Sequence, residues 1–225
     1  MERESTIRVT GRGMLRLHPD VTRITITLTG CYKEYAESLK HSSEDTESLA
    51  ALLKELGFAR KDLKTLSFSV QEKTESYQTK DLEWRERFVG FEFRHILKLD
   101  FDSDNDRLGR ILYALANAAV QPEFRLSYTV KDPEASKNAL LSAAVADATA
   151  KATVLAEASG VKLQSILRID YSMSMPDFEM RPMMGDMMMA KFTTNGSVAR
   201  SYSMDIEPDD IEVTDVVTIV WTLAK

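Results

Sequence analysis

Methionine is the residue type whose clustering in this chain most directly suggests chemistry. Eight of the eleven methionines fall within residues 173–189. Thioether sulfurs are soft ligands that suit Cu(I), so closely spaced pairs could bring three sulfurs to one ion. The pairs that could do so are Met173 with Met175, Met180 with Met183, and Met184 with Met187. A copper(I) site, or a surface whose methionines scavenge oxidants, is therefore one hypothesis for this segment.

A contact surface is the hypothesis that we favour for the same segment. Methionine side chains are unbranched and adapt to irregular partners, which suits a methionine-dense surface to packing on a second subunit or another protein. A segment without any role is the remaining alternative. The residues expected to make subunit or partner contacts include two from a long predicted helix and are Met183, Met184, Met187, Met188, Met189, Leu140 and Ala144.

Acidic residues and histidines are the other side chains that could hold a metal ion. Asp100, Asp102 and Asp104 have the spacing that begins a calcium loop, but Ile111 stands where the bidentate acid is needed. Acids at this place more simply cap the helix that follows. The three histidines lie far apart in the sequence and form no zinc-binding pattern, so we interpret them as surface or hydrogen-bonded residues. They are His18, His41 and His95.

The sequence contains no complete motif for catalysis or cofactor binding. Gly11 and Gly13 begin like a dinucleotide fingerprint, but Arg16 replaces the third glycine and no helix follows. We therefore predict a turn or bulge at residues 10–13, between strands at 6–9 and 14–17. No serine-hydrolase elbow is present. The sequence predicts no catalytic residue, no cofactor and no enzymatic activity.

A long alanine-rich helix over residues 132–161 is the clearest structural element. Asp132 is suited to the N-cap, Pro133 to the first helical position, and Gly160 to the left-handed residue that ends the helix. Apolar or small residues occur on nearly every side, and Asp147 and Lys151 can pair one turn apart. Such a helix is expected to be buried on more than one side, against a sheet and against a second helix or subunit.

The remaining patterns predict an α+β fold in a single domain of residues 1–225. Residues 21–130 read as strand, helix, strand, strand, helix, strand, which is a split βαβ core with helices on one face of a largely antiparallel or mixed sheet. A charged hairpin tip is expected at residues 71–87, with Tyr77 and Trp84 pairing across it. Residues 132–225 supply the long helix, a strand, the methionine-rich loop and a closing strand, and these strands are expected to extend the sheet.

Composition restricts the class of protein further. The net charge is −6 and no cluster of Lys and Arg forms a stripe, so binding of nucleic acid is not expected. Cys31 is the only cysteine, which we interpret as a half-buried structural thiol. No run of 18 apolar residues predicts a transmembrane segment. The first nine residues are too polar for a secretory leader, so a cytoplasmic location is expected if Met1 is the native start, and a periplasmic one if a leader was removed.

These residues resemble the SIMPL-domain family. That family includes bacterial periplasmic immunogenic and oxidative-stress-defence proteins and an animal signalling adaptor. The matching stretches span nearly the whole chain, and they consist of glycines, prolines, caps and small packing residues. They are residues 7–13, 18–20, 56–57, 62–65, 89–91, 132–161 and 207–208.

The resemblance implies an α+β fold, an envelope location in many bacterial members, assembly into large rings and no established enzymatic activity. Together with the residues, it predicts a non-enzymatic protein that self-assembles and acts as a scaffold or interaction module, in stress or envelope physiology. A homo-oligomer, with a possible further protein partner, is the expected state.

Overall fold

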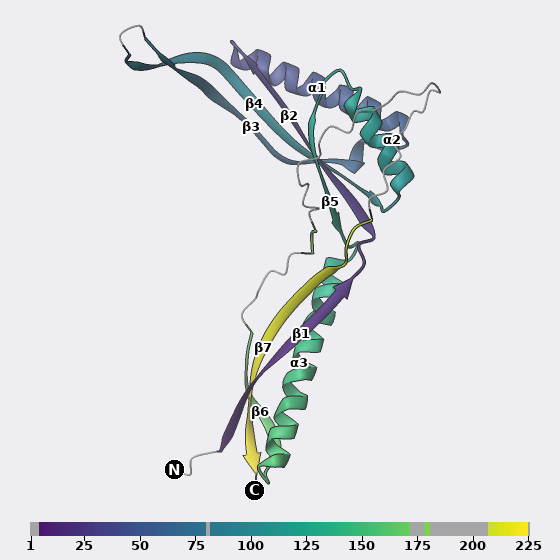
Figure 1. Cartoon of the computed structure of the whole chain (residues 1–225), viewed down its shortest axis with the longest axis vertical. Helices are drawn as coiled ribbons and strands as arrows, with labels where there is room; N and C mark the ends of the chain where they lie inside the picture. The colour runs from purple at the N-terminus through teal and green to yellow at the C-terminus, as the bar shows by residue number, and fades with distance from the viewer. Residues whose placement is uncertain (1–4, 80–81, 172–177, 181–206, 225) are drawn as a thin grey trace. The chain divides into compact units, whose positions relative to one another are not determined.

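The structure, a computed structural model, describes residues 5–79, 82–171, 178–180 and 207–224. Its described residues form two compact units (Figure 1). Among the described residues, the first unit draws on residues 5–20, 129–171, 178–180 and 208–224, and the second on residues 21–79 and 82–128. In chain order the elements are β1 Thr6–Leu17, β2 Val21–Tyr32, α1 Tyr35–Glu55, a 3-10 turn Arg60–Asp62, β3 Leu63–Gln78, β4 Trp84–Asp102, α2 Asn105–Ala116, β5 Glu123–Thr129, α3 Pro133–Ala158, β6 Lys162–Asp170 and β7 Ile211–Ala224.

The second unit is built on a four-stranded sheet in the order β3-β4-β2-β5. The alternating pattern of β2 turns Ile24, Ile26 and Leu28 to one side of this sheet, where they are buried. α1 packs against β2 and β4 and buries Leu49 and Leu53. The predicted strand at residues 21–29 and the helix that follows it are therefore confirmed.

α2 lies on the same side of the four-stranded sheet. The Arg107 guanidinium stands 4.2 Å from the ring centroid of Phe58 and 5.7 Å from that of Phe101. Phe101 shares the face of β4 that carries Leu97 and Leu99, the residues paired with Ile26 and Ile24. The α+β class and the placement of helices on one face of the sheet are confirmed.

The first unit contains a separate three-stranded sheet in the order β1-β7-β6. β1 pairs with β7 along its whole length, from Thr6 opposite Thr222 to Leu17 opposite Ile211. The expectation that the last strands extend the four-stranded sheet is therefore wrong. The two ends of the described chain instead pair with each other, a contact across more than 200 residues that no local sequence pattern specifies.

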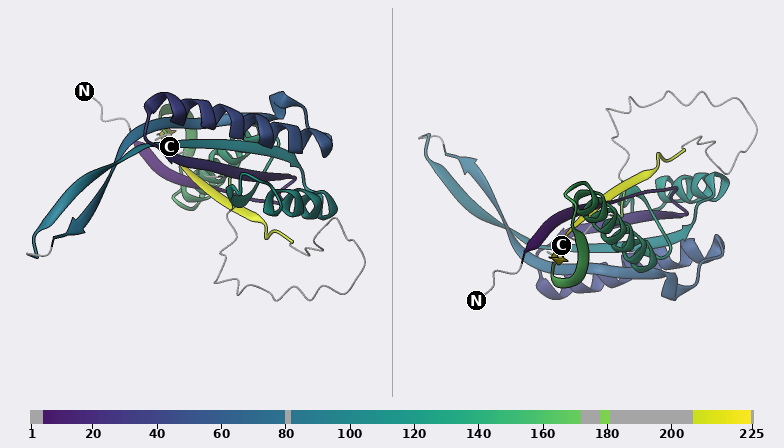
Figure 2. Two further views of the ribbon diagram at one scale, coloured as in Figure 1. Left: turned by 90° about the horizontal axis from the view of Figure 1, so that it is seen from above. Right: turned by 90° about the horizontal axis from the view of Figure 1, so that it is seen from below.

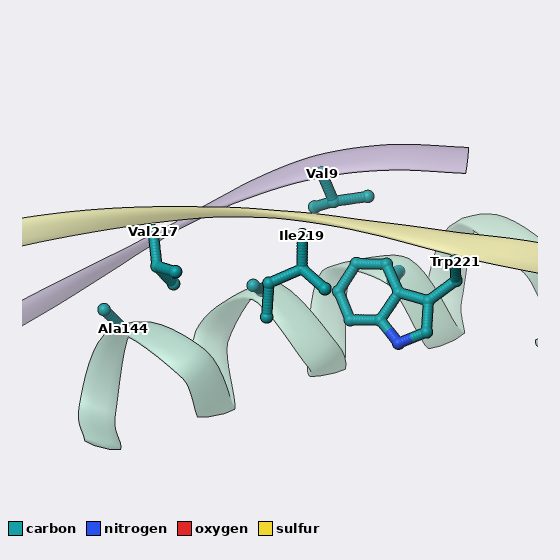
Figure 3. Packing of buried hydrophobic residues seen from close by; sticks show 7 residues of the cluster. Val9, Ala144, Val217, Ile219 and Trp221 are labelled. Carbon is teal, nitrogen blue, oxygen red and sulfur yellow. The ribbon is translucent and has the colours of Figure 1, made fainter. Parts of the chain in front are cut away.

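α3 covers one face of this three-stranded sheet. Every fourth residue of the helix is buried, mostly alanine, and these side chains meet alternate apolar residues of the strands (Figure 3). The predicted helix ends are confirmed, because the Asp132 carboxylate accepts the Ala135 amide at 2.8 Å and Gly160 has a φ of +68°. The residues of this core are Val9, Ala144, Ala148, Ala152, Val217, Ile219 and Trp221.

The predicted turn at residues 10–13 is wrong, because β1 runs without a break through both glycines. A Cβ atom on Gly11 would lie 2.1 Å from the Ala144 carbonyl oxygen. A Cβ atom on Gly13 would lie 2.2 Å from the Leu140 carbonyl oxygen. These glycines therefore serve the close approach of the α3 backbone to β1, and not a change of chain direction.

The hairpin strands continue into the residues predicted as its tip, because β3 runs to Gln78 and β4 begins at Trp84. The register of the two strands also contradicts one expected contact. Tyr77 lies opposite Arg85, and Trp84 lies opposite Gln78. The ring of Tyr77 meets the Arg87 guanidinium, 5.8 Å from the ring centroid. Pairing of Tyr77 with Trp84 is therefore wrong, because the two residues are one position out of register and successive side chains of a strand point to opposite faces.

Candidate interaction surfaces

The two helical residues expected at a subunit contact lie in the core of the first unit. Leu140 and Ala144 are both 0% exposed. Leu140 packs with Phe178, Ile211 and Val213. These side chains therefore hold α3 on its own sheet, and the helix face open to solvent is the opposite one.

The open face of α3 is nearly free of charge and carries two large exposed apolar side chains, Val154 and Leu155. Between Asn138 and Ala156 the only ionisable residues are Asp147 and Lys151. Val154 is 64% exposed. A shallow, open hollow beside it is lined entirely by one strand residue and one helix segment, namely Val9, Ala150, Lys151, Val154 and Leu155.

Asp147 joins this helix to the edge of the sheet. Its carboxylate accepts a hydrogen bond from Lys151 Nζ at 2.7 Å, which confirms the predicted pair, and another from the Arg12 amide at 2.7 Å. The hydrogen bond from Lys151, and then that from Arg12, lower the pKa of Asp147 below its usual value. Because β1 is an edge strand, Asp147 also satisfies an edge amide that would otherwise face solvent.

β6 is the opposite edge of the same sheet and carries a second group of exposed apolar side chains. Ile166, Leu167 and Ile169 are each more than half exposed. Large apolar residues on an edge strand are unusual in a protein that stays free of partners, since such an edge is a template for another strand. β6 is therefore a candidate contact surface.

The hairpin arm, defined as residues 74–79 and 82–88 of β3, β4 and their connection, is a third candidate. It extends beyond α1 in both views of Figure 2. Leu82 is 74% exposed and Trp84 is 71% exposed. The ring of Phe88 lies 5.3 Å from that of Phe91, which in turn lies 5.5 Å from Tyr35, measured between centroids. Aromatic side chains thus continue from the arm to the first turn of α1.

A buried carboxylate in the first unit escaped the sequence analysis. Asp215 is only 3% exposed and lies on the face of β7 that packs on α3. It accepts a hydrogen bond from the Tyr171 hydroxyl at 2.9 Å, and this bond raises the pKa of Tyr171. The signal was present in the sequence, because Asp215 occupies an inward position between Val213 and Val217 in an alternating strand.

The three histidines are separate, as their spacing suggests. His18 Nδ1 lies 3.3 Å from Asp210 at the surface of the first unit. His41 stacks on Tyr32 with centroids 4.1 Å apart. His95 is held between two hydroxyls, with Nδ1 3.0 Å from Thr46 Oγ1 and Nε2 2.9 Å from Thr65 Oγ1. Across the described residues, no three His, Cys, Asp or Glu side chains gather where a metal ion could sit.

His95 should make the second unit less stable in mild acid. Burial, and then the positive charge of Arg60, lower the pKa of His95 below the ordinary 6.5. The unfolded chain therefore takes up this proton first as the pH falls, so folding stability is full above about pH 6.5 and decreases below it. Unfolding by denaturant at pH 7.5 and pH 5.5 measures this difference. His95→Gln should reduce this difference; an equal pH dependence in the variant and in the unchanged chain would contradict the assignment.

The aspartates that suggested a calcium loop have structural partners. The Asp104 carboxylate accepts the Arg107 amide at 3.0 Å and caps α2, as predicted. Asp100 accepts hydrogen bonds from Arg23 Nε at 2.7 Å and Lys98 Nζ at 3.1 Å. Burial would raise the pKa of Asp100, but these bonds outweigh it and the pKa is lowered. Cys31 is exposed, so its predicted half-burial is wrong.

Comparison with known proteins is informative for nearly the entire chain. Residues 7–221 match the family SIMPL, a protein of unknown function (DUF541). The chain belongs to the SIMPL family. A search of curated proteins finds no match to it.

The residues that carry the SIMPL resemblance lie at packing and capping points. Gly57 ends α1 with a φ of +87°. The Asp20 carboxylate accepts the Lys131 amide at 2.8 Å, which fixes the start of the segment that leads into α3. A Cβ atom on Gly90 would lie 2.4 Å from the Tyr32 carbonyl oxygen. The motifs are therefore explained by their roles in packing and capping within the fold.

The methionines of the SIMPL chain mostly lie outside the described residues. Met180 is described, and it packs beside Phe178 on the cluster around Leu140. The other methionines of the copper and contact hypotheses lie outside the described residues, and they are Met173, Met175, Met183, Met184, Met187, Met188 and Met189.

α3 of this SIMPL chain is long and apolar enough to cross a membrane by length and composition. Core helices meet the same criterion, and the buried face of α3 packs on β1 and β7. Length and hydropathy therefore do not establish a membrane span.

Proposed function

We propose that this protein is a non-enzymatic scaffold that assembles with copies of itself through exposed apolar surfaces. The observation that carries the proposal is the gathering of large apolar side chains on three elements that their own unit leaves open. These are the outer face of α3, the edge strand β6 and the hairpin arm. Contiguous exposed apolar surface is typical of protein contacts.

Burial of such side chains supplies the driving force for assembly. Each Å² of apolar surface removed from water contributes about 25 cal/mol. On the outer face of α3 there is little charge to desolvate, since Asp147 and Lys151 already pair with each other. Three surfaces on different elements would allow one copy to contact more than one neighbour. The resemblance to stress-defence and periplasmic proteins is the reason to look for this scaffold in stress or envelope physiology.

The solution mass tests this proposal. We expect light scattering on the intact chain to give the mass of several copies. A variant that lacks residues 173–189 should form smaller particles if the methionine segment takes part in assembly. A matched variant with leucine at the eight methionines keeps the apolar character but removes the sulfurs, so it should assemble like the intact chain. A monomer mass for the intact chain at all concentrations would contradict self-assembly.

A further inference from the structure

We propose that β6 pairs with β6 of a second copy, edge to edge and antiparallel, with Ile166 opposite Ile166 of the other copy at the twofold axis. This proposal rests on the proposed self-assembly and names one of its interfaces. The partner of β6 is a second copy of this chain, and the sequence of the strand sets the register of the pairing.

The outer side of β6 is open among the residues that the structure describes. β6 follows β7 at the end of the sheet order, and no described strand pairs with its other side. The Ser165 amide donates to Thr222 Oγ1 at 3.2 Å, and the Thr222 hydroxyl lies 3.3 Å from the Ser165 carbonyl oxygen that accepts from it. Ser165 thus turns its backbone groups toward β7, and the described residues provide no strand on the other side of β6.

The two edges of this sheet are treated differently. On β1, Asp147 accepts the edge amide of Arg12, and the outward side chains include Arg8, Arg12 and Arg16. Charges and side-chain caps of this kind discourage pairing with another strand. β6 also carries charges, at Lys162, Arg168 and Asp170, but its centre presents Ile166 and Leu167, which are each more than half exposed. Of these two edges, β6 is therefore the one suited to strand addition.

The sequence of β6 is complementary to itself when read in the opposite direction. With Ile166 on the axis, Lys162 lies opposite Asp170 of the second copy, and Asp170 lies opposite Lys162. In the same pairing, Leu163 lies opposite Ile169, and Gln164 lies opposite Arg168. Opposite charges and apolar pairs across strands are stabilising, whereas like charges there are destabilising. A twofold axis requires such a self-complementary surface, and at each end Lys162 meets Asp170 of the other copy, whose carboxylate also pairs with Arg168 of its own strand at 2.8 Å.

The contact is short, which sets the strength of the dimer. β6 has nine residues, and its pairing with β7 shifts register on both sides of Ile166. A single strand pair of this length is smaller than the standard protein interface of about 1,600 Å². We therefore expect association to depend on concentration and to work alongside the other contact surfaces of the assembly.

Charge reversal tests this pairing on the full chain. Lys162→Asp places two Asp–Asp pairs at the ends of the interface, and Asp170→Lys places two Lys–Lys pairs there. Each single change should weaken association about tenfold, which is about 1.4 kcal/mol. The double variant K162D/D170K restores opposite charges and should return association to within about threefold of the unchanged chain. Light scattering and sedimentation across a concentration series measure the association constant.

The controls separate the pairing from general effects of charge and from the proposed function. Arg8→Asp changes charge on the other edge strand and should leave the mass unchanged, and circular dichroism should show that every variant is folded. Failure of the double variant to recover, or assembly that is indifferent to all three variants, overturns β6 pairing while self-assembly stands. A monomeric intact chain overturns both proposals.

Discussion

Gly11→Ala is expected to lower the unfolding free energy of the first unit by about 3 kcal/mol or more. The new Cβ atom would lie 2.1 Å from the Ala144 carbonyl oxygen and 2.4 Å from the Ala148 nitrogen. Both are backbone atoms in the middle of a helix, so no side-chain rotation relieves the overlap. The helix must move away from β1, and this movement loosens the contacts of Val9 and Ile219 with the alanines of α3.

Denaturant unfolding followed by circular dichroism measures this loss. Met14→Ala is a matched control, because Met14 is on the same strand but its side chain is 60% exposed on the other face. That control should change stability by less than about 0.5 kcal/mol. Equal midpoints for Gly11→Ala and the unchanged chain would show that β1 does not approach α3 as closely as the structure has it.

The ends of the helices could be predicted from the sequence because their determinants are local. Asp132, Pro133 and Gly160 act within one turn of the residues that they cap, and all three have the predicted role. Gly11 and Gly13 could not be read in the same way. A glycine serves a turn or a close approach equally well, and only the partner backbone, more than 120 residues away in α3, decides between them.

The prediction that the last strands extend the four-stranded sheet failed for a related reason. The alternation in residues 211–223 predicted a strand correctly, but pairing with β1 depends on matched lengths and apolar faces at the two ends of the described chain. The sequence of a single strand does not specify which strand it will pair with, because this choice depends on where the other strands and helices lie. The inward position of Asp215 could be read from the alternation of its strand, but its hydrogen-bond donor, Tyr171, lies 44 positions away and could not.

The buried and the exposed face of α3 could not be told apart from the sequence. A helix that is apolar on nearly all sides has no preferred direction in its sequence pattern, so Leu140 could be assigned to a subunit contact as easily as to the core. Its neighbours Ile211 and Val213 belong to a strand that begins 71 positions later. The exposed residues of β6 were recognised as a strand, but their place at an edge depends on the topology of the sheet.

Leu140→Ala should therefore destabilise the fold by about 2–5 kcal/mol and leave the contact surfaces unchanged. Leu140 is 0% exposed, and truncation removes three carbon atoms that fill space between α3 and β7. We expect a lower midpoint of denaturant unfolding. The solution mass measured at a temperature where the variant is folded should equal that of the unchanged chain.

Leu155→Ala on the same helix should have the opposite pattern of effects, with nearly unchanged stability and weaker association. Leu155 is half exposed beside Val9 in the open hollow of α3, so its loss removes little from the core and should change the unfolding free energy by less than about 1 kcal/mol. If the outer face of α3 meets a second copy, the same variant lowers the association constant. A smaller assembly for Leu140→Ala at unchanged stability would contradict its burial. Two leucines four turns apart, with identical side chains and the same substitution, thus separate the face of α3 that builds the fold from the face that we propose meets a second copy.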